Sequence, residues 1–305
     1  MRKRDFPKSY NYLSAFLTFR CNLDCSFCVN RYSSNNFKRN TFNEISGKEW
    51  VEALNKFNLP KEVPVSLVGG EPSTHPDFIY IINNINPESG IDLVTNLWWN
   101  KDKLNKFIQE VSPEKMDNHA PFQSIRVSYH PEQMGEGEKI IENTLALKEA
   151  DFDIGIECIM YPSPFQLEAL ERMAIKCQMV NIPFRPKSFI GMYEEVDDFD
   201  RPFSIRHGFY SKYPDAVFTQ ETLERMCKTS NLLISPNGSV HRCQRDLLLM
   251  ENSVGNILDS DFQIQDKFRP CNNYGQCHPC DVKVKTNNKQ ELGTTLVEIK
   301  NLKND

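Results

Sequence analysis

Apolar, strand-like runs alternate with amphipathic segments over the first two thirds of the chain, and this alternation restricts the fold more than any other feature. Such an alternation is typical of a parallel sheet built from βα units. Six units make an incomplete barrel, because a closed barrel of this type has eight. The sequence therefore predicts an α/β fold, a partial (β/α)6 TIM-type barrel, with strands at residues 13–20, 63–68, 91–95, 124–129, 152–160 and 180–189.

The segments between these strands carry helix signals. Ser46 followed by Glu49 has the pattern of a capping box, in which each side chain bonds the backbone of the other residue. Ser163 before Pro164 places an N-cap and a first-turn proline at the start of another helix. This helix is expected over residues 163–178, and we also expect helices over residues 76–86, 101–111 and 136–150.

The rhythm breaks at the acidic, proline-containing stretch EEVDDFDRPF, residues 194–203, and the sequence beyond it is turn-rich and dense in cysteine. We place a domain boundary near residue 200. Residues 1–200 then form the partial barrel, and residues 201–305 form a small, cysteine-rich α+β domain.

Composition limits the partners and the compartment. The chain has 39% hydrophobic and 25% charged residues and a net charge of −5, which is ordinary for a globular protein and argues against nucleic acid or an anionic membrane as the main partner. The first apolar run is too short for a membrane span, which needs about 18 residues. Without a signal peptide, and with cysteines spaced as metal ligands, we expect a cytoplasmic protein.

Three cysteines follow the first strand in the motif CNLDCSFC. Cys21, Cys25 and Cys28 have C-x3-C-x2-C spacing. Three thiolates can ligate three irons of a [4Fe-4S] cluster and leave the fourth iron open to a small molecule. The motif therefore predicts a reactive centre.

The motif resembles that of radical S-adenosylmethionine (SAM) enzymes, in which the open iron chelates the amino and carboxylate groups of SAM. Phe27 matches the family's aromatic residue beside the third cysteine. The second strand ends in a GGEP sequence, where glycines allow close backbone approach to a ligand and a carboxylate lies at the barrel mouth. The resemblance implies that this segment receives the amino group of SAM: Gly69, Gly70, Glu71 and Pro72.

Three more polar residues follow or lie in predicted strands where similar enzymes contact the ribose and carboxylate of SAM. They are Asn96, Ser128 and Arg185. The alternatives are a solvated strand end for Ser128 and a surface ion pair for Arg185. His130 and Glu157 could face the barrel interior as acid or base, although a structural role is the alternative for both. Catalytic residues stay unassigned.

The C-terminal part carries a second group of cysteines. Cys227 and Cys243 flank a predicted hairpin that turns at Asn237-Gly238, and Cys271, Cys277 and Cys280 follow in C-x5-C-x2-C spacing. This pattern resembles the SPASM extension or its shorter twitch form. Five cysteines, where full SPASM has seven, imply one auxiliary [4Fe-4S] cluster.

The preferred ligands of that cluster are Cys227, Cys243, Cys277 and Cys280, with Cys271 as a spare or an alternative fourth ligand. A structural zinc site, which His278 could join, is the other interpretation. Cys158 and Cys177 lie on apolar faces, and we interpret them as buried side chains rather than ligands.

The resemblance implies an enzyme that cleaves SAM to a 5′-deoxyadenosyl radical, which takes hydrogen from a substrate carbon. A fully ligated auxiliary cluster favours net oxidation. Only about twelve residues precede the first strand, which favours a small-molecule substrate over a peptide; a maturase of a ribosomally made peptide is the alternative. A flavodoxin- or ferredoxin-type protein would donate the electron. The remote alternative is a non-enzymatic zinc or iron–sulfur module.

Overall fold

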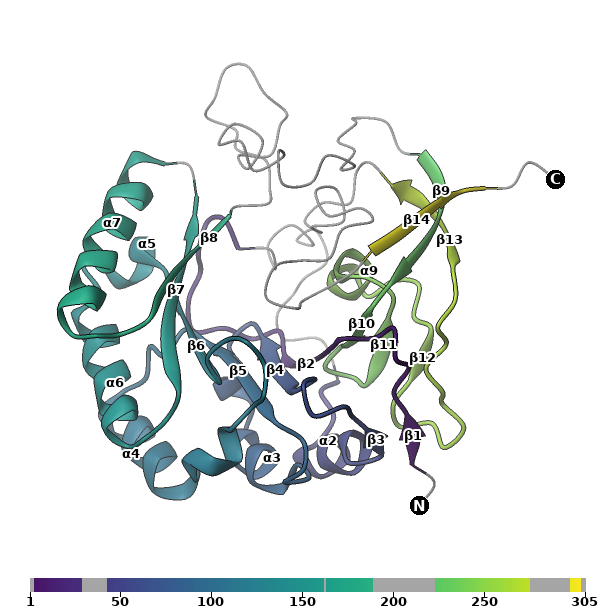
Figure 1. Ribbon diagram of the computed structural model, residues 1–305, viewed down its shortest axis with the longest axis horizontal. Coiled ribbons are helices and arrows are strands. Elements are labelled where there is room, and N and C mark those ends of the chain that lie inside the picture. Colours follow the sequence, from purple (N-terminus) through teal and green to yellow (C-terminus); the bar gives the residue numbers. More distant parts are fainter. Residues whose placement is uncertain (1–2, 29–42, 162, 189–222, 275–296, 303–305) are drawn as a thin grey trace.

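The computed structural model (Figure 1) describes residues 3–28, 43–161, 163–188, 223–274 and 297–302. In this part of the chain a nine-stranded sheet has the order β12-β11-β10-β2-β4-β5-β6-β7-β8. All pairings from β10 to β8 are parallel. The six predicted strands are confirmed as β2 (Tyr12–Thr18), β4 (Val65–Gly69), β5 (Ile91–Thr95), β6 (Ile125–Tyr129), β7 (Ile154–Met160) and β8 (Phe184–Ser188).

Helices cover the outer side of this curved sheet (Figure 1). The longer ones are α2 (Gly47–Leu54), α3 (Phe78–Asn84), α4 (Lys101–Glu110), α6 (Glu138–Glu149) and α7 (Pro164–Met179). Short turns are η1 (Pro72–Thr74), η2 (Pro113–Met116) and α5 (Pro131–Met134). The capping box of Ser46 and Glu49 is present, and the Ser163 side chain accepts a bond from the Gln166 backbone N–H.

The two faces of the sheet differ in chemistry. Alternate strand residues such as Leu13, Leu67 and Ile156 are fully buried in one hydrophobic cluster with helix residues such as Trp50 and Phe107. Because successive side chains point to opposite faces, the residues between them lie on the inner face. Many of these are polar or charged and also buried: Ser14, Ser66, Asp92, Arg126 and Glu157.

The C-terminal part extends this sheet. β10 (Asn231–Ile234) pairs in parallel with β2, and β11 (Ser239–His241) and β12 (Gly255–Asn256) follow antiparallel. The predicted hairpin between β10 and β11 is confirmed, with Gly238 at φ +80° in its turn. The predicted boundary near residue 200 lies outside the described residues.

The remaining C-terminal elements are a helix and a separate antiparallel sheet. The sheet has the order β13-β9-β14. Near the N-terminus, β1 pairs in parallel with β3. Their bounds are α9 (Gln244–Leu249), β9 (Leu223–Thr229), β13 (Arg269–Tyr274), β14 (Val297–Asn301), β1 (Arg4–Asp5) and β3 (Phe57–Asn58). In the described part of the chain, no helix combines the length and the apolar character needed to cross a membrane.

Candidate active site

The three motif cysteines lie on one loop directly after β2. The Cys28 backbone N–H donates to the Cys25 carbonyl at 3.2 Å, and Cys25 is buried while the other two thiols are partly exposed. Burial raises the pKa of the Cys25 thiol to about 12, and the nearby Cys28 and Cys21 thiols contribute to that rise. Their thiolates would repel one another, and cationic iron would relieve that repulsion.

The donor set of the cysteine loop fits an iron–sulfur cluster. Such clusters take cysteine thiolates as ligands, and the ligands of a four-iron cluster each bind a different iron. Three thiols follow β2 on one short loop, at Cys21, Cys25 and Cys28. Among the described residues, no three His, Cys, Asp or Glu side chains are grouped to hold a single metal ion.

Contacts on its C-terminal side fix the cysteine loop. The Ser26 hydroxyl and backbone N–H donate to the Glu132 carboxylate on α5, at 2.8 Å and 3.0 Å. Phe27 is buried and stacks on Tyr161 with 4.9 Å between ring centroids, and the His130 ring lies 5.8 Å away. Phe27 therefore anchors the loop to the ends of β6 and β7.

The two glycines at the end of β4 let the chain pass against the residues that precede Cys21. The Gly70 N–H donates to the Thr18 carbonyl and the Glu71 N–H to the Arg20 carbonyl, both at 2.8 Å. A Cβ added at Gly69 would lie 2.2 Å from the Thr18 carbonyl oxygen, and Gly69 has φ +154°. The sequence predicts that these glycines allow a ligand to approach the backbone. The structure adds that they also allow the end of β4 to approach the backbone of residues 18–20.

Replacing Gly70 with alanine is expected to disturb the cysteine loop. The new Cβ would lie 2.3 Å from the Arg20 carbonyl oxygen and 2.5 Å from that of Phe19, and backbone cannot move aside as a flexible side chain can. Overpacking of this kind costs about 1–3 kcal/mol. We expect a lower melting temperature and weaker SAM binding by the reconstituted protein. An unchanged SAM affinity would contradict this role of Gly70.

Glu71 joins the ends of β4 and β5. Its carboxylate is 1% exposed. It accepts hydrogen bonds from the Ser73 hydroxyl at 2.5 Å, the Thr95 hydroxyl at 2.7 Å and the Asn96 backbone N–H at 2.7 Å. The side chain is thus engaged with protein donors, and Pro72 begins η1 beside it. Glu71 therefore orders the strand ends, and its contact with SAM stays a prediction.

Asn96 lies against the first cysteine. Its side-chain amide donates to the side-chain Oδ1 of Asn22 at 2.7 Å and to the Cys21 sulfur at 3.7 Å. Through Asn96 and Glu71, the structure joins three sequence-predicted segments: the cysteine loop, the GGEP segment and the residue after the third predicted strand. Hydrogen bonds to cluster sulfurs are among the factors that set cluster potentials.

Ser128 and Arg185 lie farther along the inner face. Both residues pair in register with Glu157, one from β6 and one from β8. Arg185 forms an ion pair with the Glu157 carboxylate, and so does Lys187. The structure therefore brings these two predicted residues into one row. It joins them through Glu157, a residue considered above for acid–base chemistry.

The two acid–base candidates have different charge states near neutral pH. Burial lowers the pKa of His130 to about 4, so its ring is neutral, and its Nδ1 is buried with no hydrogen-bond partner among the described residues. Burial alone would raise the pKa of Glu157, but the charges of Lys187, Arg126 and Arg185 outweigh it and lower that pKa. Glu157 is therefore an ionised carboxylate rather than a proton donor.

Three cysteines of the second group lie around one arginine. Burial would lower the pKa of the Arg242 guanidinium, but its electrostatic interactions with Cys243, Asp246, Cys271 and Cys227 outweigh burial and raise that pKa. These thiols come from β9, β13 and the residue before α9. Cys277 and Cys280, and with them His278, lie outside the described residues. Cys271, predicted as a spare or an alternative fourth ligand, thus belongs to the same group as the preferred ligands Cys227 and Cys243.

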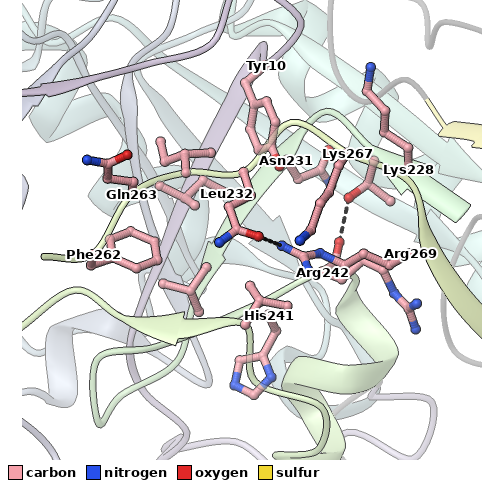
Figure 2. A pocket seen from close by; sticks show the side chains of 15 residues that line it. Tyr10, Lys228, Asn231, Leu232, His241, Arg242, Phe262, Gln263, Lys267 and Arg269 are labelled. Carbon is pink, nitrogen blue, oxygen red and sulfur yellow. Dashed lines mark hydrogen bonds between the residues drawn. The ribbon is translucent and has the colours of Figure 1, made fainter. Parts of the chain in front are cut away.

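A polar pocket adjoins Arg242 (Figure 2). Tyr10, Lys228, Lys267 and Arg269 are among its lining residues. Within the described part of the chain, the Arg242 Nε and Asn231 Oδ1 atoms are buried without hydrogen-bond partners. Water can satisfy such atoms, so the pocket suits water or a small polar ligand.

Sequence reasoning missed several residues that build the site. Glu132 lies in the HPEQ turn after the fourth predicted strand, which marks it as a residue at the barrel mouth. Its contact with Ser26 could not be predicted, because the two residues are far apart in the sequence. Lys187 could have been noticed only because it is a charged residue within the sixth predicted strand.

Cys158 and Cys177 are buried as expected, and burial raises the pKa of their thiols to about 12 and about 11.

Comparisons with known proteins bear on the family and the fold of the chain. The family model described as Radical SAM superfamily matches residues 16–174. A GTP 3′,8-cyclase from Aquifex aeolicus (strain VF5) is 32% identical over 138 residues, which is 44% of this chain and 39% of the relative. The chain thus aligns with well under half of that relative's length.

Solved structures share the fold. A structure of histidine-tagged anSMEcpe with bound AdoMet superposes with a TM-score of 0.51 at 14% identity, covering 81% of this chain and 74% of that chain. Native anSMEcpe with bound AdoMet and a Cp18Cys peptide gives a TM-score of 0.50 at 13% identity, covering 81% and 77%. At this identity the likeness extends to the fold alone.

Proposed function

The chain belongs to the radical SAM superfamily, and from this membership we propose that Cys21, Cys25 and Cys28 hold a [4Fe-4S] cluster with an open iron. Bound there, the cluster would supply the electron that cleaves SAM to a 5′-deoxyadenosyl radical, which takes hydrogen from a substrate carbon. The observation that carries the proposal is the joining of the cysteine loop to the ends of β4 and β5 through Gly70, Glu71 and Asn96.

The residues of the chain have distinct parts in this proposal. Gly69, Gly70, Glu71 and Pro72 hold the strand end at which the amino group of SAM would lie. Phe27, buried and stacked on Tyr161, would shield that side of the loop from water, and exclusion of water protects a reactive radical. Ser128 and Arg185 would contact the ribose and carboxylate of SAM, as the resemblance implies.

We propose a small molecule as the substrate. The likeness to GTP 3′,8-cyclase, whose name specifies a nucleotide, supports this choice over a peptide, the alternative substrate of a peptide maturase. The electron would come from a flavodoxin- or ferredoxin-type protein. The direct experiment is anaerobic reconstitution with iron and sulfide, followed by dithionite and SAM. Release of 5′-deoxyadenosine is expected, and its absence from a protein with full iron content would contradict the proposal.

A second cluster is proposed for the C-terminal cysteines, in a SPASM- or twitch-like arrangement. Cys227 and Cys271 lie on the paired antiparallel strands β9 and β13, and Arg242, the neighbour of Cys243 in the sequence, interacts with all three cysteines. This grouping supports these three as ligands, with the fourth supplied by Cys277 or Cys280. A cluster with four protein ligands has no open iron, so it would accept an electron from the substrate radical and give net oxidation.

Replacing Cys271 with alanine tests this ligand set. If Cys271 is a ligand, iron content is expected to fall from about eight to about four per chain, while uncoupled release of 5′-deoxyadenosine continues. Cys177→Ala is the matched control, because Cys177 is buried on α7 and should leave the iron content unchanged. A Cys271→Ala protein with about eight irons would return Cys271 to the role of a spare.

A further inference from the structure

The pocket beside Arg242 lies at the edge of the nine-stranded sheet that is opposite to the cysteine loop (Figure 2). Asn231, the first residue of β10, lines it, and so does Tyr10, which precedes β2. In the parallel pair of β10 and β2, Asn231 is the register partner of Tyr12. Because the cysteine loop follows the carboxyl end of β2, the pocket at the amino ends of these strands is separate from the place proposed for SAM.

The lining of this pocket is positively charged. It includes no carboxylate and four cationic side chains: Lys228, Arg242, Lys267 and Arg269. Ion pairs with Asp266 and Glu298 neutralise Lys228. In the part of the chain that the structure describes, Lys267 and Arg269 form no ion pair, and Arg269 donates only to the Gln265 side chain at 3.4 Å. The lining therefore keeps a surplus of positive charge.

Arg242 is the most buried of these cations and has an unused donor. Its side chain is 10% exposed. The two terminal nitrogens donate to the Pro270 carbonyl oxygen at 2.5 Å and to the Asp246 carboxylate at 3.0 Å. The Nε atom is buried and has no hydrogen-bond partner among the described residues. Since a charged donor forms its strongest hydrogen bonds with a charged acceptor, an anion is the preferred partner of Nε.

Asn231 adds an unused acceptor to the same pocket. Its Oδ1 atom is also buried without a hydrogen-bond partner in the described part of the chain. A ligand that satisfies both residues must accept a hydrogen bond from Arg242 and donate one to Asn231. Ionised carboxylate has acceptors only, and so has sulfate. Hydrogen phosphate has acceptor oxygens and an O–H group, so it meets both demands.

We infer that this pocket binds a protonated phosphate group, which accepts from Arg242 Nε and donates to Asn231 Oδ1. Lys267 and Arg269 supply the balancing positive charge. The inference does not rest on the proposed function, because neither the cysteine loop nor the GGEP segment lines the pocket. Free phosphate and the phosphate of a monoester share this chemistry. Arg242 precedes Cys243 in the sequence, so the phosphate would lie next to the second group of cysteines.

Calorimetric titration of the anaerobically reconstituted full chain tests the inference. The probes are inorganic phosphate, sulfate and phenyl phosphate at constant ionic strength and about pH 6, where free and esterified phosphate both carry a proton. The variants are Asn231→Leu, which removes the acceptor at similar volume, and Arg242→Lys, which keeps the charge and removes Nε–H. The matched control is Asn105→Leu, at an exposed position of α4.

We expect the wild-type protein to bind phosphate about tenfold more tightly than sulfate, because an unpaired buried acceptor opposes sulfate alone. In Asn231→Leu this preference should disappear, whereas Asn105→Leu should retain it. In Arg242→Lys the affinity for both anions should fall about tenfold, since a hydrogen bond from a charged donor is lost. If Arg242→Lys does not fold, Arg269→Gln replaces it, and weaker binding of both anions is again expected.

Three results would overturn the inference. They are no binding of phosphate, which would leave water in the pocket, equal affinities for phosphate and sulfate in the wild-type protein, and an unchanged preference in Asn231→Leu. The phenyl phosphate titration distinguishes the two sources of the group. Affinity similar to that of inorganic phosphate supports a monoester as the ligand, and binding of inorganic phosphate alone supports free phosphate.

Discussion

Replacing Cys21, Cys25 or Cys28 with alanine is expected to reduce 5′-deoxyadenosine release to the level of a protein-free control. Each thiolate would hold a different iron, so the loss of one opens a second iron and destabilises the cluster. The fold should persist, because the loop keeps its contacts through Ser26 and Phe27. Anaerobic reconstitution, iron analysis and chromatography of the products measure the effect.

Cys158→Ala is the matched control for this experiment. Its thiol is buried on β7 and accepts a Gln166 side-chain hydrogen bond at 3.5 Å, so SAM cleavage should continue at the wild-type rate. A Cys25→Ala protein that still releases 5′-deoxyadenosine at the rate of the control would remove the cysteine loop from the mechanism.

Replacing Asp92 with alanine is expected to lower the free energy of unfolding by about 3–5 kcal/mol, because removing one partner of a buried ion pair leaves the other charge uncompensated. Asp92 is fully buried, and the Arg126 side chain that it binds is 7% exposed. Urea denaturation followed by circular dichroism measures the loss.

Two companion variants separate the buried charge from other causes. The double variant Asp92→Leu with Arg126→Met removes both charges and should recover most of the stability, because apolar residues of similar volume can replace a buried pair. Glu136→Ala breaks an exposed ion pair with Arg172, and pairs of that kind contribute little, so no measurable change is expected. An Asp92→Ala protein as stable as the wild type would contradict the stabilising role of the buried Asp92–Arg126 ion pair.

Local patterns in the sequence account for most of the barrel. The six strands and the helices between them follow from apolar periodicity, and the caps at Ser46 and Ser163 follow from residue types that satisfy free backbone N–H groups. The pairing of β10 with β2 could not be predicted in this way. It joins residues that lie far apart in the sequence, such as Asn231 and Tyr12, and periodicity shows which face of a strand is buried but not which strand lies beside it.

The sequence predicts three cysteine ligands for the candidate site, but it does not show which residues hold their loop in place. Spacing identifies the cysteine loop, because the chemistry of a cluster demands thiols at short intervals. The resemblance implies that the Glu71 carboxylate receives the amino group of SAM, and the structure adds four hydrogen bonds from protein donors to that carboxylate. The hydrogen-bond partners of Glu71 include residues of another segment, so no local sequence pattern predicts them. Charged residues within otherwise apolar strands, such as Asp92 and Arg126, indicate that the inner face of the sheet is polar. An analysis of apolar periodicity alone does not detect this.

The most direct test of the open iron is a comparison of Mössbauer and EPR spectra of the anaerobically reconstituted, reduced protein before and after addition of SAM. We expect [4Fe-4S] signals in the wild-type protein, one of which is absent from the Cys25→Ala protein. That signal should shift when SAM is added, because SAM binds the unligated iron of the cluster. A cluster spectrum that is identical with and without SAM, or the absence of any cluster that depends on Cys25, would contradict the account.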